Sequence, residues 1–212
     1  MKKLVLGIFV VTLFSFNLKA IDYGIRGGVN FSSLPNVEVD LGNYKLFGEP
    51  DNYFGYHIGG FTQVKFLSLY FQPEILFTSV GTFMRLEEVE NDITFEINRA
   101  YFKTRYYKVD VPLMIGPHIG PVRLGVGPVY SLMLGHSNDY DAEILGVDYK
   151  QNLFLSNFGY QIAAGISLGN LILDLKYEAG LSKFGDTVTV GSVTNPFNGR
   201  PRQVILSIGL LL

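Results

Sequence analysis

The sequence predicts a single all-β domain, an eight-stranded antiparallel up-and-down transmembrane β-barrel. Three observations predict it: apolar and polar residues alternate in eight segments, each segment has about ten residues or more, and charge is scarce. A tilted strand needs about this length to cross the hydrocarbon of a bilayer, roughly twice the usual length of a soluble strand. Charged residues make up only 17% of the chain, so much of its surface is expected to meet something other than water.

The clearest pair of strands lies in residues 106–134. Up to residue 115 every second residue is apolar, and the residues between them include Lys108 and Asp110. A Gly/Pro-rich stretch at 116–120 predicts a tight turn, after which the alternation resumes at Val122. Since a lone hairpin would leave N–H and C=O groups unsatisfied in lipid, further strands must close a barrel.

The other segments repeat this pattern along the chain. Strands are expected at residues 21–32, 53–64, 69–81, 157–168, 171–182 and 204–212, with the fourth strand beginning as early as residue 100. Long polar loops alternate with short turns, such as the two-residue turn Gly169-Asn170. Transmembrane barrels alternate extracellular loops with periplasmic turns in this way, and aromatic residues near the ends of the apolar faces fit interfacial girdles.

The first twenty residues have the layout of a secretory signal peptide. Lys2 and Lys3 precede the apolar run 4–16, and cleavage is expected after Ala20, which leaves a barrel domain at 21–212. A transmembrane anchor is the alternative, but this run falls short of the roughly twenty apolar residues that a spanning helix needs. The mature protein is therefore expected outside the cytoplasm.

The amino-acid composition disfavours several other classes of protein and site. A soluble barrel of the lipocalin type would turn the same alternation inside out, but its Gly/Ser/Gln-rich face would carry too little charge for a water-facing surface. The formal net charge of −2 provides no basic field, so no nucleic-acid partner is expected. Because the chain has no Cys, disulfides, thiol nucleophiles, Cys-ligated metals and lipoprotein anchors are excluded.

Charged residues on the polar faces are expected to line the inside of the barrel. They are four basic and four acidic residues: Arg26, Lys108, Arg123 and Lys176, and Glu74, Asp110, Asp174 and Glu178. The interior of an eight-stranded barrel is only wide enough for side chains to fill it, so these charges are expected to pair in a structural network. A gated polar path or a proton relay through the same residues is the alternative.

No pattern in the sequence predicts a catalytic, cofactor or metal site. His57, on a lumen face, is expected to be a hydrogen-bonded filler rather than a general base. No spacing brings Ser, His and a carboxylate together on the lipid-facing wall, as a membrane lipid hydrolase would require. The acidic residues within 87–96 and 139–143 lack the ligand spacing of an EF-hand, so solvated loops are expected there, with divalent-cation binding as the alternative.

Several runs of residues resemble a known family. They are YYKVDVPLMIG, VRLGVGPVYSLML and FGYQIAAGISLGNLILDLKYEAGLSKF, together with GGVNF at 27–31 and QPE at 72–74. The resemblance, which extends over the mature chain, is to small outer-membrane β-barrels including PorT-like proteins. Such barrels often end in an aromatic residue, whereas this chain ends in Leu212. The resemblance implies a cell outer membrane location and, for PorT-like members, a link to protein secretion, with no catalytic residues.

The sequence thus predicts a non-enzymatic barrel without cofactors, in contact with outer-membrane lipid and with envelope or secretion proteins. A membrane-embedded lipid-modifying enzyme and a small-solute channel are the alternatives.

Overall fold

The computed structural model describes residues 21–33, 38–40, 44–48, 53–88, 99–140, 149–153, 155–183, 185–190, 193–196 and 200–212. The predicted signal peptide, residues 1–20, lies outside these ranges. The part of the chain that is described consists of strands and turns, and it contains no helix with the length and apolarity needed to cross a bilayer.

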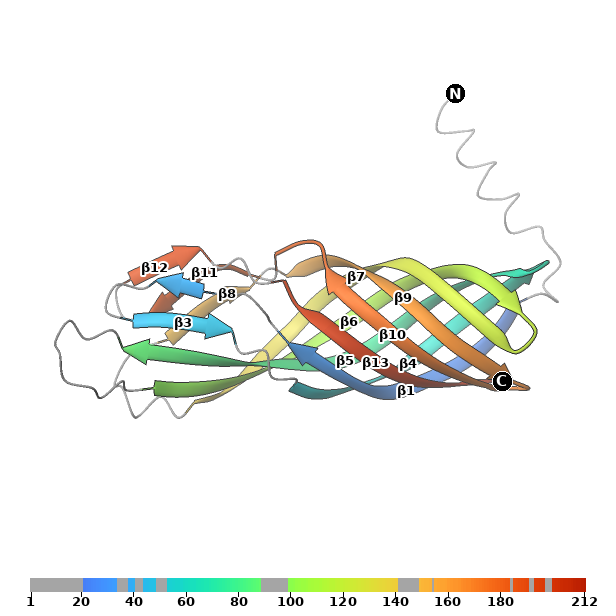
Figure 1. The fold of residues 1–212 in the computed structure, drawn as a ribbon, viewed down its shortest axis with the longest axis horizontal. Helices are drawn as coiled ribbons and strands as arrows, with labels where there is room; N and C mark the ends of the chain where they lie inside the picture. The colour runs from blue at the N-terminus through green and yellow to red at the C-terminus, as the bar shows by residue number, and fades with distance from the viewer. Residues whose placement is uncertain are drawn as a thin grey trace, which may run out of the picture.

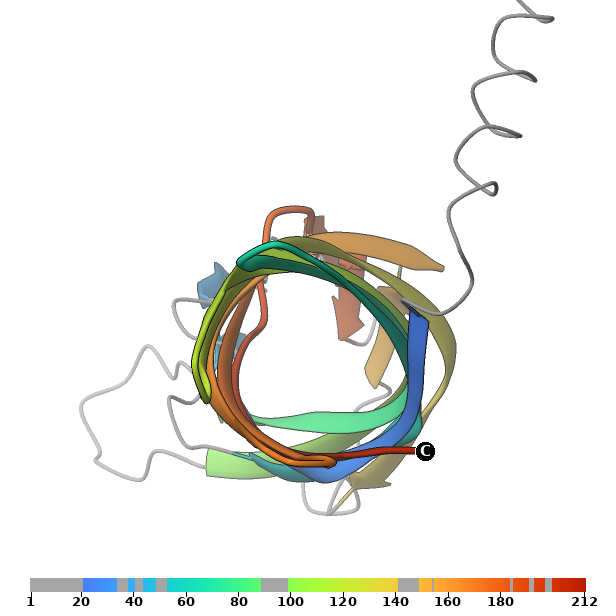
Figure 2. The same ribbon diagram turned by 90° about the vertical axis from the view of Figure 1, so that its right-hand side faces the viewer.

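Eight antiparallel strands of the described chain close into a barrel (Figures 1 and 2). They are β1 (Ile21–Ser33), β4 (Tyr53–Phe66), β5 (Leu69–Glu88), β6 (Arg99–Ile119), β7 (Val122–Tyr140), β9 (Ser156–Leu168), β10 (Leu171–Gly180) and β13 (Arg202–Leu211). Each strand pairs with the next one along the barrel, and β13 pairs with β1 to close the ring. The predicted eight-stranded barrel is confirmed.

Two barrel strands, β5 and β7, continue well beyond the segments that the alternation predicts, and β6 begins at Arg99, close to the earliest start predicted from the sequence. β5, β6 and β7 have 20, 21 and 19 residues, whereas β10 and β13 have 10 each. Short strands accompany these extensions: β2 (Glu38–Asp40) and β3 (Tyr44–Gly48) extend the sheet from β5, and β8 (Tyr149–Leu153), β11 (Gly185–Val190) and β12 (Val193–Pro196) form a separate sheet. We call these five short strands and the distal parts of β5, β6 and β7 the loop-end lobe; it lies on the left of Figure 1.

Two-residue turns join the strands at the other end of the barrel, on the right of Figure 1. Gly120, Gly169 and Leu67 each occupy the first turn position, with φ of 60°, 61° and 54°. Because the second turn residues Ser68, Pro121 and Asn170 do not have a positive φ, these are type II′ hairpin turns, in which Gly is the usual first residue. The turn predicted at 116–120 is shorter than expected, because β6 remains paired up to its last residue and only Gly120 and Pro121 turn.

The inner face of the barrel is polar and the outer face is apolar. Side chains alternate between the two faces along the barrel strands, most regularly in β13, where successive residues are exposed and buried in turn. The exposed apolar side chains include Ile58, Ile75 and Leu175, at 62%, 65% and 52% exposure, and together they form the lipid-facing wall. The core of the molecule therefore lies inside the barrel.

Candidate functional site

Charged side chains inside the barrel form the main candidate site. All eight residues predicted for the lumen are buried there, on β1, β5, β6, β7 and β10. The structure brings them together in two groups. The turn-side cluster consists of Arg26, Glu74, Arg123, Asp174 and Lys176, and the loop-side cluster consists of Lys108, Asp110 and Glu178.

Glu74 lies at the centre of the turn-side cluster. Its Oε1 accepts a hydrogen bond from Arg26 Nη1 at 2.9 Å, and both of its carboxylate oxygens lie 2.9 Å from Lys176 Nζ. Arg26 Nη2 lies 2.7 Å from Asp174 Oδ2, and Asp174 Oδ1 lies 3.2 Å from Arg123 Nε. The five side chains therefore form one continuous chain of ion pairs.

The contact between Glu74 and Lys176 spans the lumen. Glu74 is on β5 and Lys176 is on β10, and the order β5-β4-β1-β13-β10 separates these strands by four positions in a ring of eight. The two strands therefore lie on opposite walls. Because their side chains meet at 2.9 Å, they form a strut that fills the centre of the barrel.

Neutral amides add hydrogen bonds to the turn-side cluster. Gln72 Nε2 donates to Glu74 Oε1 at 2.7 Å, and Gln72 Oε1 accepts from Gln63 Nε2 at 2.7 Å and from Arg123 Nη2 at 2.8 Å. Buried ion pairs are better tolerated when such additional hydrogen bonds supplement them. The sequence places both glutamines on polar faces but carries no signal of these contacts.

Buried apolar side chains lie at the turn-side end of the lumen, and we call them the apolar layer. Phe61, Tyr70, Met114 and Ile172 form it, and none of them is more than 4% exposed. The guanidinium carbon of Arg26 lies 5.0 Å from the centre of the Phe61 ring, and that of Arg123 lies 4.3 Å from the centre of the Tyr70 ring. These distances are those of cation–π contacts, so the charged cluster is packed directly onto the apolar layer.

Glu178 and Lys108 organise the loop-side cluster. Lys108 Nζ lies 3.0 Å from Asp110 Oδ1 and 3.2 Å from Glu178 Oε1. Two amides also bind the Glu178 carboxylate: Gln161 Nε2 donates to Oε2 at 2.6 Å, and Gln203 Nε2 donates to Oε1 at 2.7 Å. The cluster thus connects β6, β9, β10 and β13 across the part of the lumen nearer the loop end.

The two clusters carry opposite excess charges. With ordinary ionisation, the three cations and two carboxylates of the turn-side cluster give a net charge of +1. The one cation and two carboxylates of the loop-side cluster give −1. The lumen network is neutral only as a whole. Loss of a carboxylate from the turn-side cluster, or of the cation from the loop-side cluster, therefore increases the excess charge of a buried site.

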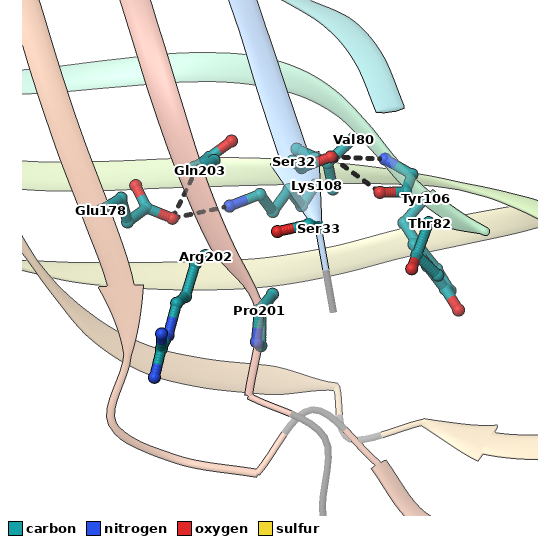
Figure 3. Close-up of a pocket in the computed structure, with 11 residues that line it drawn as sticks. Ser32, Ser33, Val80, Thr82, Tyr106, Lys108, Glu178, Pro201, Arg202 and Gln203 are labelled. Atoms are coloured by element: carbon teal, nitrogen blue, oxygen red, sulfur yellow. Dashed lines mark hydrogen bonds and ion pairs between the residues drawn. The ribbon is translucent and has the colours of Figure 1, made fainter. Parts of the chain in front are cut away.

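A small cavity lies above the loop-side cluster (Figure 3). Its volume is about 30 Å³, which is room for about two water molecules. Lys108, Glu178 and Gln203 are among its lining residues, together with Val80 and Tyr106. The hydrogen bonds between Lys108, Glu178 and Gln203 connect the two sides of this cavity. A small cavity near the loop end therefore borders the loop-side cluster.

His57 lies in the lumen beside Ser207 and Asn30. One ring nitrogen, Nε2, lies 2.8 Å from Ser207 Oγ, and the other, Nδ1, lies 3.5 Å from Asn30 Oδ1. A Ser–His contact is the arrangement of an activated nucleophile, but both side chains are buried and face inward, at 4% and 3% exposure. The contacts are those of a hydrogen-bonded filler that ties β4 to β1 and β13.

Among the described residues, no group of three or more His, Asp and Glu side chains is arranged to hold a metal ion. The acidic side chains within 87–96 and 139–143 lie outside the described part of the structure, so divalent-cation binding there stays a prediction.

Comparison with known proteins agrees with the fold. The outer membrane protein beta-barrel domain family matches residues 14–185. The crystal structure of the outer membrane protein OprG from Pseudomonas aeruginosa is similar, with a TM-score of 0.54 and 10% identity over 91% of this chain and 97% of that one. Neisserial surface protein A has a TM-score of 0.40 and 13% identity over 90% and 97% of the two chains. No curated protein sequence matches. The similarity to OprG, at 10% identity, is one of fold alone.

Proposed function

Because the chain belongs to the outer membrane protein beta-barrel domain family, we propose that it is a sealed, non-conducting barrel that acts through contacts of its loop-end lobe. Its location is the outer membrane, and the long connections at the loop end are on the cell exterior in barrels of this class. The barrel serves as the anchor, and envelope proteins are its partners.

The strut between Glu74 and Lys176 is the observation that carries this proposal. An ion or solute on the barrel axis would have to separate two charges that meet at 2.9 Å, with the apolar layer of Phe61 and Tyr70 beyond them. Breaking a buried ion pair by losing one partner typically costs about 3–5 kcal/mol. The lumen is therefore a packed core, which supports an interaction role over a small-solute channel.

Conductance of the purified mature protein in planar lipid bilayers tests the sealed lumen. We expect no single-channel steps under conditions in which a reconstituted porin gives them. Steady steps from the folded protein would refute the sealed barrel and favour the channel alternative.

The loop-end lobe supports the second part of the proposal. β5 has six residues more than its neighbour β4, which corresponds to roughly 20 Å of additional strand. β2 and β3 widen this extension, and β12 lies against β2, which connects the two sheets of the lobe. Closing the barrel does not require these additional paired strands outside the membrane. The resemblance to PorT-like proteins supports a protein-secretion component as the partner.

Co-purification from native outer membranes tests the partner. We expect envelope proteins to co-purify with the intact chain and to be lost when a short Gly/Ser linker replaces residues 185–196, which form β11 and β12. The barrel of that variant should still fold, because β10 and β13 pair independently of this segment. Retention of the same partners by the variant would place the contact elsewhere.

No enzymatic activity is proposed. A lipid-modifying enzyme must present its catalytic groups to lipid, and the contact of His57 with Ser207 faces the lumen instead.

A further inference from the structure

A pair of cations lies on the outer wall of the barrel, just beyond the aromatic girdle at the loop end. Phe77 and Tyr107 stack in this girdle, with ring centroids 6.1 Å apart. Arg105 and Lys103 are the next two residues on the same face of β6, because the intervening Thr104 and Tyr106 are buried. They therefore lie roughly 7 and 13 Å farther along the strand than Tyr107.

Tyr53 holds both cations in place. Its ring lies over Gly81, where an added Cβ would come within 2.6 Å of ring carbons. Arg105 Nε donates a hydrogen bond to Tyr53 Oη at 2.6 Å, and Lys103 Nζ lies 5.3 Å from the ring centre. Gly81 lies opposite Arg105 in the register of β5 and β6, so the missing side chain makes room for this arrangement. The site is built by packing and does not depend on free surface side chains.

The positive charge of this site favours the binding of an anion. Among the described side chains, no carboxylate forms an ion pair with Lys103 or Arg105. Asp139 is opposite Lys103 in the register of β6 and β7, and even with its charge the two cations leave the patch positive. The two cations beside the Tyr53 ring repel each other, and an anion placed between them attracts both and offsets that repulsion.

We propose that Lys103 and Arg105 bind the phosphate of an outer-leaflet glycolipid headgroup, whose acyl chains lie on the apolar wall below. The position of the site favours this ligand, because the polar headgroups begin directly beyond Phe77 and Tyr107. Its chemistry also favours it, because a guanidinium fork and an ammonium together recognise phosphate. A lipid is favoured over free phosphate because its acyl chains contact the wall at the same time.

Binding of lipid A to the mature protein in detergent, measured by native mass spectrometry, tests the proposal. We expect diphosphorylated lipid A to bind about tenfold or more tightly than the same glycolipid without phosphates, because charge-assisted hydrogen bonds to the phosphate are lost. Inorganic phosphate at the same concentration should not compete. Equal binding of the two glycolipids, or full competition by phosphate, would overturn the assignment.

Variants then locate the site. Lys103→Gln combined with Arg105→Gln should remove the preference for the phosphorylated lipid, and Arg105→Lys, which keeps the charge but loses the fork, should weaken binding several-fold. Lys65→Gln is the matched control: it removes one exposed cation, paired with Asp22 at 3.1 Å, at the opposite end of the barrel, and should change nothing. Unchanged binding by the double variant, or an equal loss in Lys65→Gln, would refute the site. Heat-modifiable migration in gels verifies that each variant is folded.

Discussion

Glu74 and Lys176 should respond unequally to the loss of their charges. In Glu74→Gln, three cations remain around Asp174 alone, so we expect a loss of about 3–5 kcal/mol in the free energy of unfolding. In Lys176→Met, the turn-side cluster keeps two cations and two carboxylates. Its own charge is then balanced, and we expect a smaller loss of about 1–3 kcal/mol, the usual value of charged hydrogen bonds.

The double variant shows whether the strut exists. Lys176→Met should offset part of the damage caused by Glu74→Gln, so the two effects together should fall short of their sum by more than about 1 kcal/mol. Urea unfolding in phospholipid vesicles gives the free energies from the midpoint and the slope. Lys176→Met combined with Glu178→Gln is the matched control, because Glu178 pairs with Lys108, and its coupling should be clearly smaller.

Two outcomes would refute this reasoning. Equal losses in the two single variants would show that the excess positive charge of the turn-side cluster has no energetic effect. Additive effects in the double variant would show that water separates the two side chains. The exposed pair of Lys65 and Asp22 sets the scale, since pairs of that kind contribute at most about 1 kcal/mol.

Three further predictions concern the wall and the turns. Leu175→Arg should reduce the yield of folded protein in liposomes, because Arg on the lipid face costs about 2–4 kcal/mol near the bilayer midplane. Gly28→Ala should destabilise the barrel, since its Cβ would collide with the backbone oxygen of Leu206, whereas Gly27→Ala should be nearly neutral, because the nearest atom is 3.5 Å away. Leu67→Gly should raise the urea midpoint, since Leu at φ of 54° is strained by about 1–2 kcal/mol.

Each of these predictions has a contradicting result. Full folding of Leu175→Arg would mean that the inner and outer faces are reversed. Equal effects of the alanine substitutions at Gly27 and Gly28 would show that the strands do not approach each other as closely as the structure has them. A lower urea midpoint for Leu67→Gly would mean that lost contacts of the exposed leucine outweigh the relieved strain.

The sequence predicts which residues enter the lumen but not which of them meet. Alternation places Lys176 and Glu178 on the same face, because apolar residues flank both. Their partners differ, however: Lys176 contacts Glu74 on the opposite wall, and Glu178 contacts Lys108. Glu74 and Lys176 are 102 residues apart, and their meeting depends on strand tilt and register around the whole ring. The alternation of apolar and polar residues contains no information about strand tilt or register.

The extensions of β5 and β7 escape prediction for a different reason. The alternation arises because lipid covers one face of a strand and the polar lumen covers the other. Beyond the girdle both faces meet water or protein, and the pattern no longer marks a strand. Arg105 and Tyr53 lie within predicted strands, but their contact joins side chains of two strands and has no counterpart in the sequence pattern.

The first and last strands of the barrel are neighbours, with Ile25 opposite Leu210 and Phe31 opposite Val204. Until β13 arrives, β1 and β10 each present an unpaired row of N–H and C=O groups. Hydrocarbon cannot accommodate such edges, so the preceding seven strands cannot wait in the bilayer as an open sheet. Insertion and closure of this seam must therefore coincide, after the last strand has been synthesised, and both edges need shielding by a chaperone or by the insertion machinery until then.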